Sequence, residues 1–344
     1  MKKEILISLE TSPLPAKLPL VKFSPSFLKI PHLATYTGIL PEAFWNCWER
    51  KTYTELKPFN SWISHQKLRD LALKLGYSEK DEHLTRVLNR LEHGCNIGCK
   101  GAGRLPTRHK NAKSTEEYGV RVADALQGWI KDGLCYGPLE EHELPWGDFT
   151  VNPITVKLKP NGKARICIDM SAPYIDTKSG ETVPSSVNSG IDTDEFPTSM
   201  SSTKSFCESL MKAGCPGEMC KIDWNQVRLG IFSSNISICC FWNQAYKHLA
   251  VRKEDHKLQV LSFGGKFFGE VMLTFGCASS AGHFDDTAKL VKNMAEKAAN
   301  MDKSMVNQVL DDVVACGTEG DGTVARFYKA YRDICNKVGI SLAD

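Results

Sequence analysis

The chain has 344 residues, which is enough for two ordinary domains or one large composite domain. Its content of 42% hydrophobic and 24% charged residues excludes a wholly disordered chain and a collagen. No stretch reaches the roughly 18 apolar residues of a membrane span, and the N-terminus lacks a signal-peptide core. We therefore expect an intracellular protein, in the cytoplasm or the nucleus, that has no membrane partner.

Positive charge is concentrated in two segments, although the formal net charge is only +3. Residues 96–114 contain no acid and residues 151–173 contain only one, while the two segments hold these cations: Lys100, Arg104, Arg108, Lys110, Lys113, Lys157, Lys159, Lys163 and Arg165. A charge run is usually a solvated face, but two basic segments in one chain indicate an anionic polymer as a partner. The 13 cysteines lack zinc-site spacing and indicate free thiols in a reducing compartment.

The N-terminal half is predicted in two parts. Residues 1–63 are rich in proline, which favours an extended, loop-rich segment without a packed fold. Residues 64–150 are predicted to be a helical N-terminal or fingers region. Within them, apolar periodicity predicts a helix from Ser64 that pauses at Gly76 and resumes to Gly94.

A further helix and a hairpin follow. Ser114 and Glu117 have the spacing of a capping box, and the helix that they begin is predicted to stop at Gly133. After this helix the helical spacing of apolar residues ends. Residues 154–159 and 163–169 are strand-like runs on either side of an Asn-Gly turn. This pattern predicts a β-hairpin.

Residues 151–344 are predicted to form one α+β region. After the first hairpin, the pattern predicts a short helix, a strand, a long helix, a second hairpin and a last helix, at about 204–213, up to Asp223, 284–301, 305–315 and 323–338. Strand, helix, hairpin and helix in this order are typical of a split βαβ sheet with helices on one face.

Three aspartates stand where this topology would bring them together. Asp223 ends the predicted strand, and Asp311 with Asp312 forms the tip of the second hairpin. Magnesium prefers such hard carboxylate ligands, and two ions between them suit the displacement of a phosphoryl group. An Asp-Asp pair is also typical of a solvated turn, so these residues alone do not decide between the two interpretations.

Several motifs occur in a fixed order that adds to this evidence. They are Pro153 to Ser171, Val187-Asn188, Phe196-Pro197, Lys221-Ile222-Asp223-Trp224, Ala245 to Arg252, Phe275 to Phe284, Val309 to Asp312 and Val338-Gly339. Together, over roughly residues 95–344, the chain resembles the reverse transcriptases of eukaryotic retroelements, closest to the DIRS-like group. The resemblance implies a fingers-and-palm fold with a ferredoxin-like palm sheet, and we expect the thumb to be missing.

The resemblance also implies an activity and its partners. It implies an RNA-directed DNA polymerase that adds deoxynucleotides to the primer of an RNA or DNA template. Asp223, Asp311 and Asp312 would be its catalytic residues and would bind two Mg²⁺ ions. The implied nucleotide-binding residues are Lys157, Lys159, Arg165, Tyr246, Gly276 and Gly282.

Each of these nucleotide-binding residues also has a plainer interpretation. The cations suit a triphosphate, and Arg165 offers a planar fork, but they also suit a surface strand. Tyr246 resembles the aromatic gate that rejects a 2′-hydroxyl, but it also suits a protein core. Gly276 and Gly282 would permit a close backbone approach to template and nucleotide, or simply the entry into a helix.

One departure from the family pattern puts activity in doubt. Asp223 and Tyr246 are 23 positions apart, and removing the 18 residues 227–244 restores the family motif. We interpret this surplus segment as an unspliced in-frame intron, with a genuine insertion or a short duplication as the alternatives. The chain is therefore predicted to be a polymerase of impaired activity. Two alternatives remain for the function of the chain. The first is an inactive nucleic-acid-binding relic, and the second, which we rank lower, is another carboxylate-metal enzyme such as a nuclease.

Overall fold

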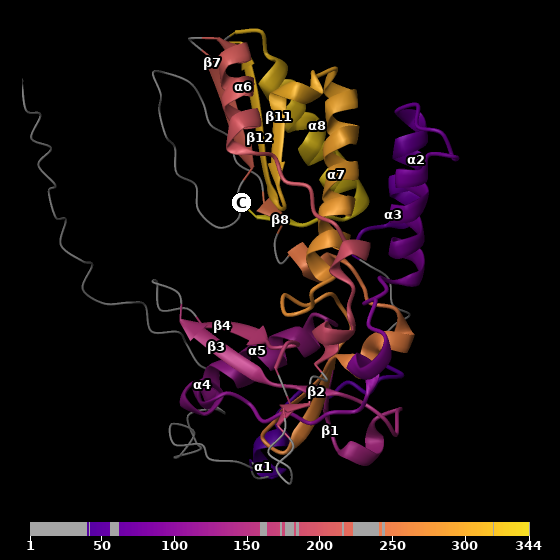
Figure 1. Ribbon diagram of the computed structural model, residues 1–344, viewed down its shortest axis with the longest axis vertical. Helices are drawn as coiled ribbons and strands as arrows, with labels where there is room; N and C mark the ends of the chain where they lie inside the picture. The colour runs from indigo at the N-terminus through magenta and orange to yellow at the C-terminus, as the bar shows by residue number, and fades with distance from the viewer. Residues whose placement is uncertain are drawn as a thin grey trace, which may run out of the picture.

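The computed structural model describes residues 40, 42–55, 62–158, 164–172, 174–175, 182–183, 186–214, 217–222, 241–242, 245–318 and 320–343. At one end of the molecule, helices α6 (Thr203–Ala213), α7 (Ser280–Ala299) and α8 (Thr323–Val338) surround a three-stranded sheet (Figure 1). The hairpin of β3 (Ile154–Leu158) and β4 (Ala164–Ile168) lies toward the other end. The fold is α+β, as predicted.

The three-stranded sheet contains the predicted strand and the predicted second hairpin. Its order is β11 (Val306–Val309), β12 (Asp312–Thr318) and β7 (Gly217–Ile222), and all neighbours are antiparallel. The central strand β12 places Val313 and Ala315 in the hydrophobic core, fully buried. Strands far apart in the sequence thus meet in one sheet.

Helices lie on both faces of this sheet. Asn307 of β11 donates a hydrogen bond of 2.7 Å from Nδ2 to Ser209 Oγ of α6. Gln308, the next residue, lines a pocket together with Asp285 and Lys289 of α7. Because successive side chains of a strand point to opposite faces, α6 and α7 contact opposite faces. The predicted helix layer on one face consists of α7 and α8, which pack on each other, and α6 covers part of the other face.

The last helix follows its sequence pattern closely. Its buried side chains recur every three or four residues, as expected for a helix with one apolar face, and are Val324, Phe327, Tyr331, Ile334, Cys335 and Val338. Thr323 is its first residue and not its cap, because Gly322 occupies the N-cap position.

Two predicted N-terminal helices are confirmed. Helix α2 (His65–Lys74) begins after Ser64, whose side chain accepts a hydrogen bond from the backbone of the first turn. Helix α3 (Glu82–His93) has Asp81 as its cap and ends at Gly94, which has a φ of 87°. A positive φ suits glycine, so this residue stops the helix as expected.

The predicted single helix from Ser114 to Gly133 is divided in two. Helices α4 (Lys113–Glu117) and α5 (Gly119–Lys131) are separated at Tyr118. The predicted capping box was wrong, because Ser114 lies inside α4 and its Oγ accepts a 3.0 Å hydrogen bond from the backbone of Val156. This serine therefore connects the helix to strand β3 instead of beginning the helix.

A four-stranded sheet was not predicted. It contains β1 (Cys135–Leu139), β10 (Lys266–Glu270), β9 (Val260–Phe263) and β2 (Val151–Asn152), in that order. Strand β1 is buried along its whole length and contains Gly137 and Pro138, which are uncommon inside strands. Strand β2 has only two residues. Neither strand shows the alternation on which a prediction depends.

Part of the segment predicted as extended packs on this sheet. Helix α1 (Glu42–Trp45) and the residues after it bury Phe44, Trp45 and Trp48. The ring centre of Trp45 lies 6.5 Å from that of Phe263, with the rings edge to face. The proline pattern did not predict this aromatic anchor. Residues 1–39 lie outside the described residues.

The remaining elements are short. The strands are β5 (Tyr174–Ile175), β6 (Thr182–Val183), β8 (Phe241–Trp242) and β13 (Leu342–Ala343). Short 3-10 helices lie at Gly101–Arg104, Glu141–Glu143, Val187–Gly190, Thr193–Glu195, Ala245–His248, Lys253–Leu258 and Lys303–Met305. Of the helices in the described ranges, none has the length and apolar character needed to cross a membrane.

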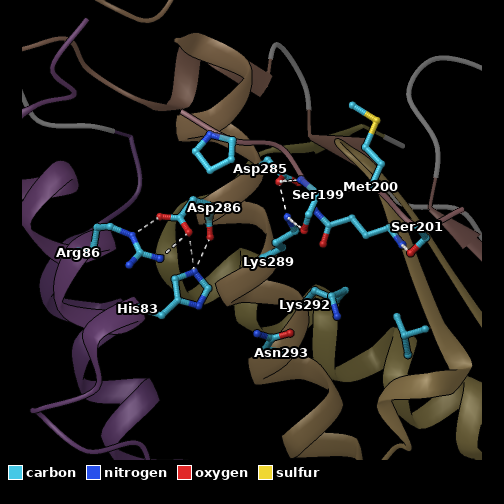
Figure 2. A pocket seen from close by; sticks show the side chains of 13 residues that line it. His83, Arg86, Ser199, Met200, Ser201, Asp285, Asp286, Lys289, Lys292 and Asn293 are labelled. Atoms are coloured by element: carbon cyan, nitrogen blue, oxygen red, sulfur yellow. Dashed lines mark hydrogen bonds and ion pairs between the residues drawn. The ribbon is translucent and has the colours of Figure 1, made fainter. Parts of the chain in front are cut away.

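Asp286 of α7 holds α3 in place. Arg86 donates two hydrogen bonds of 2.8 Å to its carboxylate (Figure 2), and Arg90 and His83 form ion pairs with it. Burial opposes ionisation, but the hydrogen bonds from Arg86 and His83 and the charge of Arg90 keep the pKa of Asp286 well below its usual range. The hydrogen bond with Asp286 raises the pKa of His83, despite desolvation.

This cluster predicts a loss of stability at both ends of the pH range. The contribution of Asp286 is present above its unfolded pKa of about 3.9 and is lost as the pH falls below it. The contribution of His83 is present below about pH 6.5 and is lost as the pH rises through its raised folded pKa. We expect Asp286→Asn to lower the free energy of unfolding by about 2 kcal/mol near neutral pH. In urea unfolding, His83→Gln should remove the loss of stability at alkaline pH and leave the loss at acid pH. If stability still falls at alkaline pH in this variant, His83 is not its cause.

Candidate active site at the Asp311–Asp312 turn

The paired aspartates lie where β11 turns into β12. Val309 pairs with Asp312, so Leu310 and Asp311 form a two-residue turn and Asp312 begins the next strand. Leu310 has a φ of 52°, a left-handed conformation that non-glycine residues seldom adopt. Gln308 Nε2 donates a 2.7 Å hydrogen bond to Leu310 O, which holds the turn. Asp311 and Asp312 are both half-buried, and Asp312 lines a groove together with Asn307, Val309 and residues of α6.

Strand β7 ends beside this turn. Its last described residue, Ile222, pairs with Val313, the residue that follows Asp312. The predicted first catalytic residue, Asp223, follows Ile222 in the sequence and lies outside the described residues. The register therefore brings the described end of the predicted strand next to the aspartate pair.

Tyr246 lies within electrostatic reach of the same turn. Its side chain is buried, and its ring meets those of Phe275 and Phe284 edge to face, with centres 4.4 Å and 5.4 Å away. Burial, followed by the negative charges of Asp311 and Asp285, raises the pKa of Tyr246 to about 12. Tyr246 is thus a core tyrosine that also lies near Asp311, and its role as the aromatic gate stays a prediction.

Phe275 joins the tyrosine to the predicted fingers hairpin. The guanidinium carbon of Arg165 lies 5.7 Å from the centre of its ring, within the range of a cation–π contact. Phe275 is 59% exposed, which is unusual for a large apolar side chain. Phe275 belongs to one of the sequence motifs, but no role was predicted for it because exposure cannot be read from residue type. Arg165, Phe275, Tyr246 and Asp311 therefore follow one another from the hairpin to the turn.

The described part of the hairpin presents one pair of cations. Lys157 of β3 lies opposite Arg165 of β4, and both are exposed. Lys159 and Lys163 belong to the connecting loop, residues 159–163, which lies outside the described residues. The described pair offers two cations to an anion at this edge of the site.

The first basic segment is less available than predicted. Lys100 pairs with Glu195, Arg104 pairs with the buried Asp255, and Arg108 pairs with Glu141, so distant acids neutralise three of its five cations. Lys110 and Lys113 are exposed. Most of this segment therefore serves the fold, and the hairpin is the better candidate for binding an anion.

The two predicted glycines are packed against the protein's own backbone. A Cβ atom at Gly276 would lie 1.7 Å from Ile168 O, and one at Gly282 would lie 2.4 Å from Phe196 O. Asn188 holds the same loop, because its Nδ2 donates to Gly276 O at 2.8 Å and its Oδ1 accepts from Ala278 N at 2.9 Å. Gly276 thus sets the distance between β4 and the loop of Phe275, and Gly282 sets the distance between α7 and Phe196. Nucleotide binding by these glycines stays a prediction.

The donor chemistry at the turn fits a magnesium ion. Asp311 and Asp312 supply hard carboxylate oxygens, which Mg²⁺ prefers. Among the described side chains there is no group of three or more His, Cys, Asp or Glu residues placed to hold a metal. The predicted set includes Asp223, which is outside that part of the chain.

Comparison with known proteins gives the following. No protein-family model and no curated protein matches the sequence. One similar solved structure is that of the native Prototype Foamy Virus Protease-Reverse Transcriptase, with 12% identity, a TM-score of 0.46, and coverage of 83% of this chain and 34% of that one. Another is the foamy viral protease-reverse transcriptase in complex with dsDNA, with 13% identity, a TM-score of 0.45, and coverage of 83% of this chain and 52% of that one. The chain thus spans about a third to a half of the length of these proteins.

Proposed function

We propose that this chain carries the fingers and palm of an RNA-directed DNA polymerase of a retrotransposon, of the DIRS-like group. The ordered sequence motifs support this function. The fold supports it as well, because the motifs that contain Arg165, Tyr246, Phe275 and Asp311 contact one another or lie within electrostatic reach. Its partners would be a primed RNA or DNA template and a deoxynucleoside triphosphate.

The observation that carries the proposal is the register of β7. Since Ile222 pairs with Val313, the chain leaves β7 toward Asp223 next to the turn of Asp311 and Asp312. Three carboxylates from two separate parts of the sequence, Asp223 and the Asp311–Asp312 pair, would then line one edge of the sheet, and together they would hold two Mg²⁺ ions. When bound, the ions would supply Lewis-acid stabilisation of the reacting phosphate and of the primer hydroxyl.

The other residues would bind and orient the nucleotide. Lys157, Lys159 and Arg165 would offset the charge of the triphosphate, and the Arg165 guanidinium matches phosphate oxygens with two parallel donors. Tyr246 and Phe275 would contact the sugar and the base, with the tyrosine buried deeply enough to act as a fixed wall. Catalysis would then consist of positioning and electrostatic stabilisation.

A second candidate is an inactive relic that still binds nucleic acid. The 18 surplus residues between Asp223 and Tyr246 favour it, since they separate two motifs that must act together. A longer loop is cheap, at about 0.6 kcal/mol per doubling of its length. Catalytic geometry must hold within about 0.5 Å, so folding would survive the surplus segment more readily than activity.

A primer-extension assay separates these candidates. We expect the version lacking residues 227–244 to extend a primer on an RNA template with Mg²⁺ and deoxynucleotides, and the full chain to be slower by at least about tenfold. Primer binding without extension by either version would support the relic. Cleavage of the template without added nucleotides would instead indicate a nuclease.

A further inference from the structure

Strand β8 belongs to the surplus segment, and it pairs with β13 near the end of the chain. The pair is antiparallel and places Phe241 opposite Ala343 and Trp242 opposite Leu342. Within the described part of the chain, β13 pairs with β8 alone. In the shortened chain, which is the version without residues 227–244, β13 would lose this partner unless another segment takes the place of β8.

A repeated tripeptide offers that replacement. Trp-Asn-Gln occurs at 224–226, directly after Asp223, and again at 242–244. The first copy and Asp223 lie outside the described residues, whereas the second copy begins in β8. Phe241 stands five positions before Tyr246 in the full chain, and Asp223 stands at the same spacing in the shortened chain. The shortened chain can therefore place Asp223 in the register that Phe241 has in the full chain.

The sheet has room for β13 beside the strand that leads to Asp223. Strand β7 pairs with β12 through one edge, where Ile222 lies opposite Val313. Its other edge pairs with no strand among the described residues. Helix α8 packs against β12, β7 and β13, so these three strands lie along one helix. Since a strand can pair through both of its edges, β7 continued by the register of β8 would lie between β12 and β13.

We propose that the surplus segment divides one strand into β7 and β8, and that β13 positions Asp223 when the strand is undivided. This inference rests on the proposed polymerase function. In the full chain that edge of β13 is occupied by Phe241 and Trp242, so it cannot also pair with Asp223. Catalytic geometry must hold within about 0.5 Å, so the loss of one flanking strand accounts for an impaired activity.

The register is tested by pairs of introduced cysteines that are oxidised with oxidised glutathione. Residues directly opposite in an antiparallel pair have Cα atoms about 4.5–5.5 Å apart, a separation that a disulfide can bridge. We expect Trp242→Cys with Leu342→Cys to form a disulfide in the full chain. Trp224→Cys with Leu342→Cys should form one in the shortened chain. Mass spectrometry of the digested protein distinguishes these bonds from any that involve the native cysteines.

The matched control carries the same two substitutions in the other version of the chain. Trp224→Cys with Leu342→Cys in the full chain should give a disulfide yield at least about tenfold lower than in the shortened chain. Thermal melting shows whether each variant is folded. Where a tryptophan replacement prevents folding, a second set keeps both tryptophans. It pairs Ala343→Cys with Phe241→Cys in the full chain and with Asp223→Cys in the shortened chain.

The positioning role is tested by Leu342→Pro combined with Ala343→Pro. Proline has no N–H, so the two changes remove the backbone donors of β13 whichever residue faces the neighbouring strand. In the shortened chain we expect Mn²⁺ binding to weaken and primer extension at saturating nucleotide to slow, each by about tenfold. The same change should leave Mn²⁺ binding of the full chain unaltered, whereas a general loss of structure would weaken it in both versions.

Three outcomes would overturn the proposal. They are equal disulfide yields of Trp224→Cys with Leu342→Cys in the two versions, no such disulfide in the shortened chain, and equal effects of the two prolines in both versions. A shortened chain that extends primers without forming the disulfide would refute the role of β13 and leave the polymerase proposal intact. A shortened chain that forms the disulfide and extends no primer would support the divided strand and count against the polymerase.

Discussion

Replacing Asp311 by asparagine is expected to slow primer extension by roughly 10³-fold or more, in whichever form of the chain extends a primer. The change keeps the shape of the turn and removes one negative charge from the proposed metal site. Since each tenfold loss corresponds to about 1.4 kcal/mol, the expected effect is about 4 kcal/mol of transition-state stabilisation. Asp312→Asn should act in the same direction.

The control for this prediction is a distant aspartate. Asp333 lies exposed on α8, and Asp333→Asn should leave the extension rate unchanged. Thermal melting should show that Asp311→Asn is folded, because its carboxylate is only half-buried in the turn. If Asp311→Asn extends primers as fast as Asp333→Asn does, the turn is not the active site.

The largest effect on stability is expected at a buried ion pair. Lys247 and Glu270 form an ion pair in which their side chains are 10% and 0% exposed. The Lys247 ammonium also lies 4.9 Å from the centre of the Trp129 ring. Removing one partner leaves the other charge buried and uncompensated, so Lys247→Met or Glu270→Gln alone should lower the free energy of unfolding by about 3–5 kcal/mol.

The double replacement and a surface pair separate charge from packing. Lys247→Met with Glu270→Met removes both charges and keeps similar volumes, so it should be more stable than either single variant. Lys204 and Glu208 form an exposed pair on α6, and Lys204→Met there should change stability by less than about 0.5 kcal/mol. Chemical denaturation measures all of these. If the double variant loses as much free energy of unfolding as the two single variants together, packing and not charge would account for the losses.

The second hairpin and the last helix could be predicted because their patterns are local. In α8 the apolar spacing from Val324 to Val338 matches its buried face. In the hairpin, apolar runs on either side of Asp311 and Asp312 are confirmed as β11 and β12. The spacing of apolar residues within a segment predicts whether it forms a helix or a strand, and distant contacts need not be known.

The four-stranded sheet and the ion-pair cluster could not be predicted from the sequence. Strand β1 lacks alternation because it is buried throughout and holds Gly137 and Pro138. The contact of Asp286 with Arg86 joins residues 200 positions apart, which no local pattern records. Side-chain ion pairs of this kind depend on how helices pack, and that is decided by the whole fold.

The candidate site was predicted from the resemblance of its motifs, and the structure shows which of the described motifs lie close together. Arg165, Tyr246 and Asp311 are residue types whose chemistry suits a nucleotide, and their motifs lie together in the structure. Phe275 was missed because only its exposure and its place between Arg165 and Tyr246 indicate a binding role. Gly276 and Gly282 were predicted to bind nucleotide, but their close packing on the protein's own backbone is by itself a reason for glycine at both positions.

The convergence of three carboxylates is tested most directly by metal binding. Mn²⁺, used in place of Mg²⁺, is titrated into the chain and the free ion is measured by electron paramagnetic resonance. We expect Asp223→Asn and Asp311→Asn each to weaken Mn²⁺ binding by about tenfold or more, because both side chains would ligate the same ions. Unchanged Mn²⁺ binding in Asp223→Asn, with a loss in Asp311→Asn, would contradict a shared site and with it the proposed polymerase.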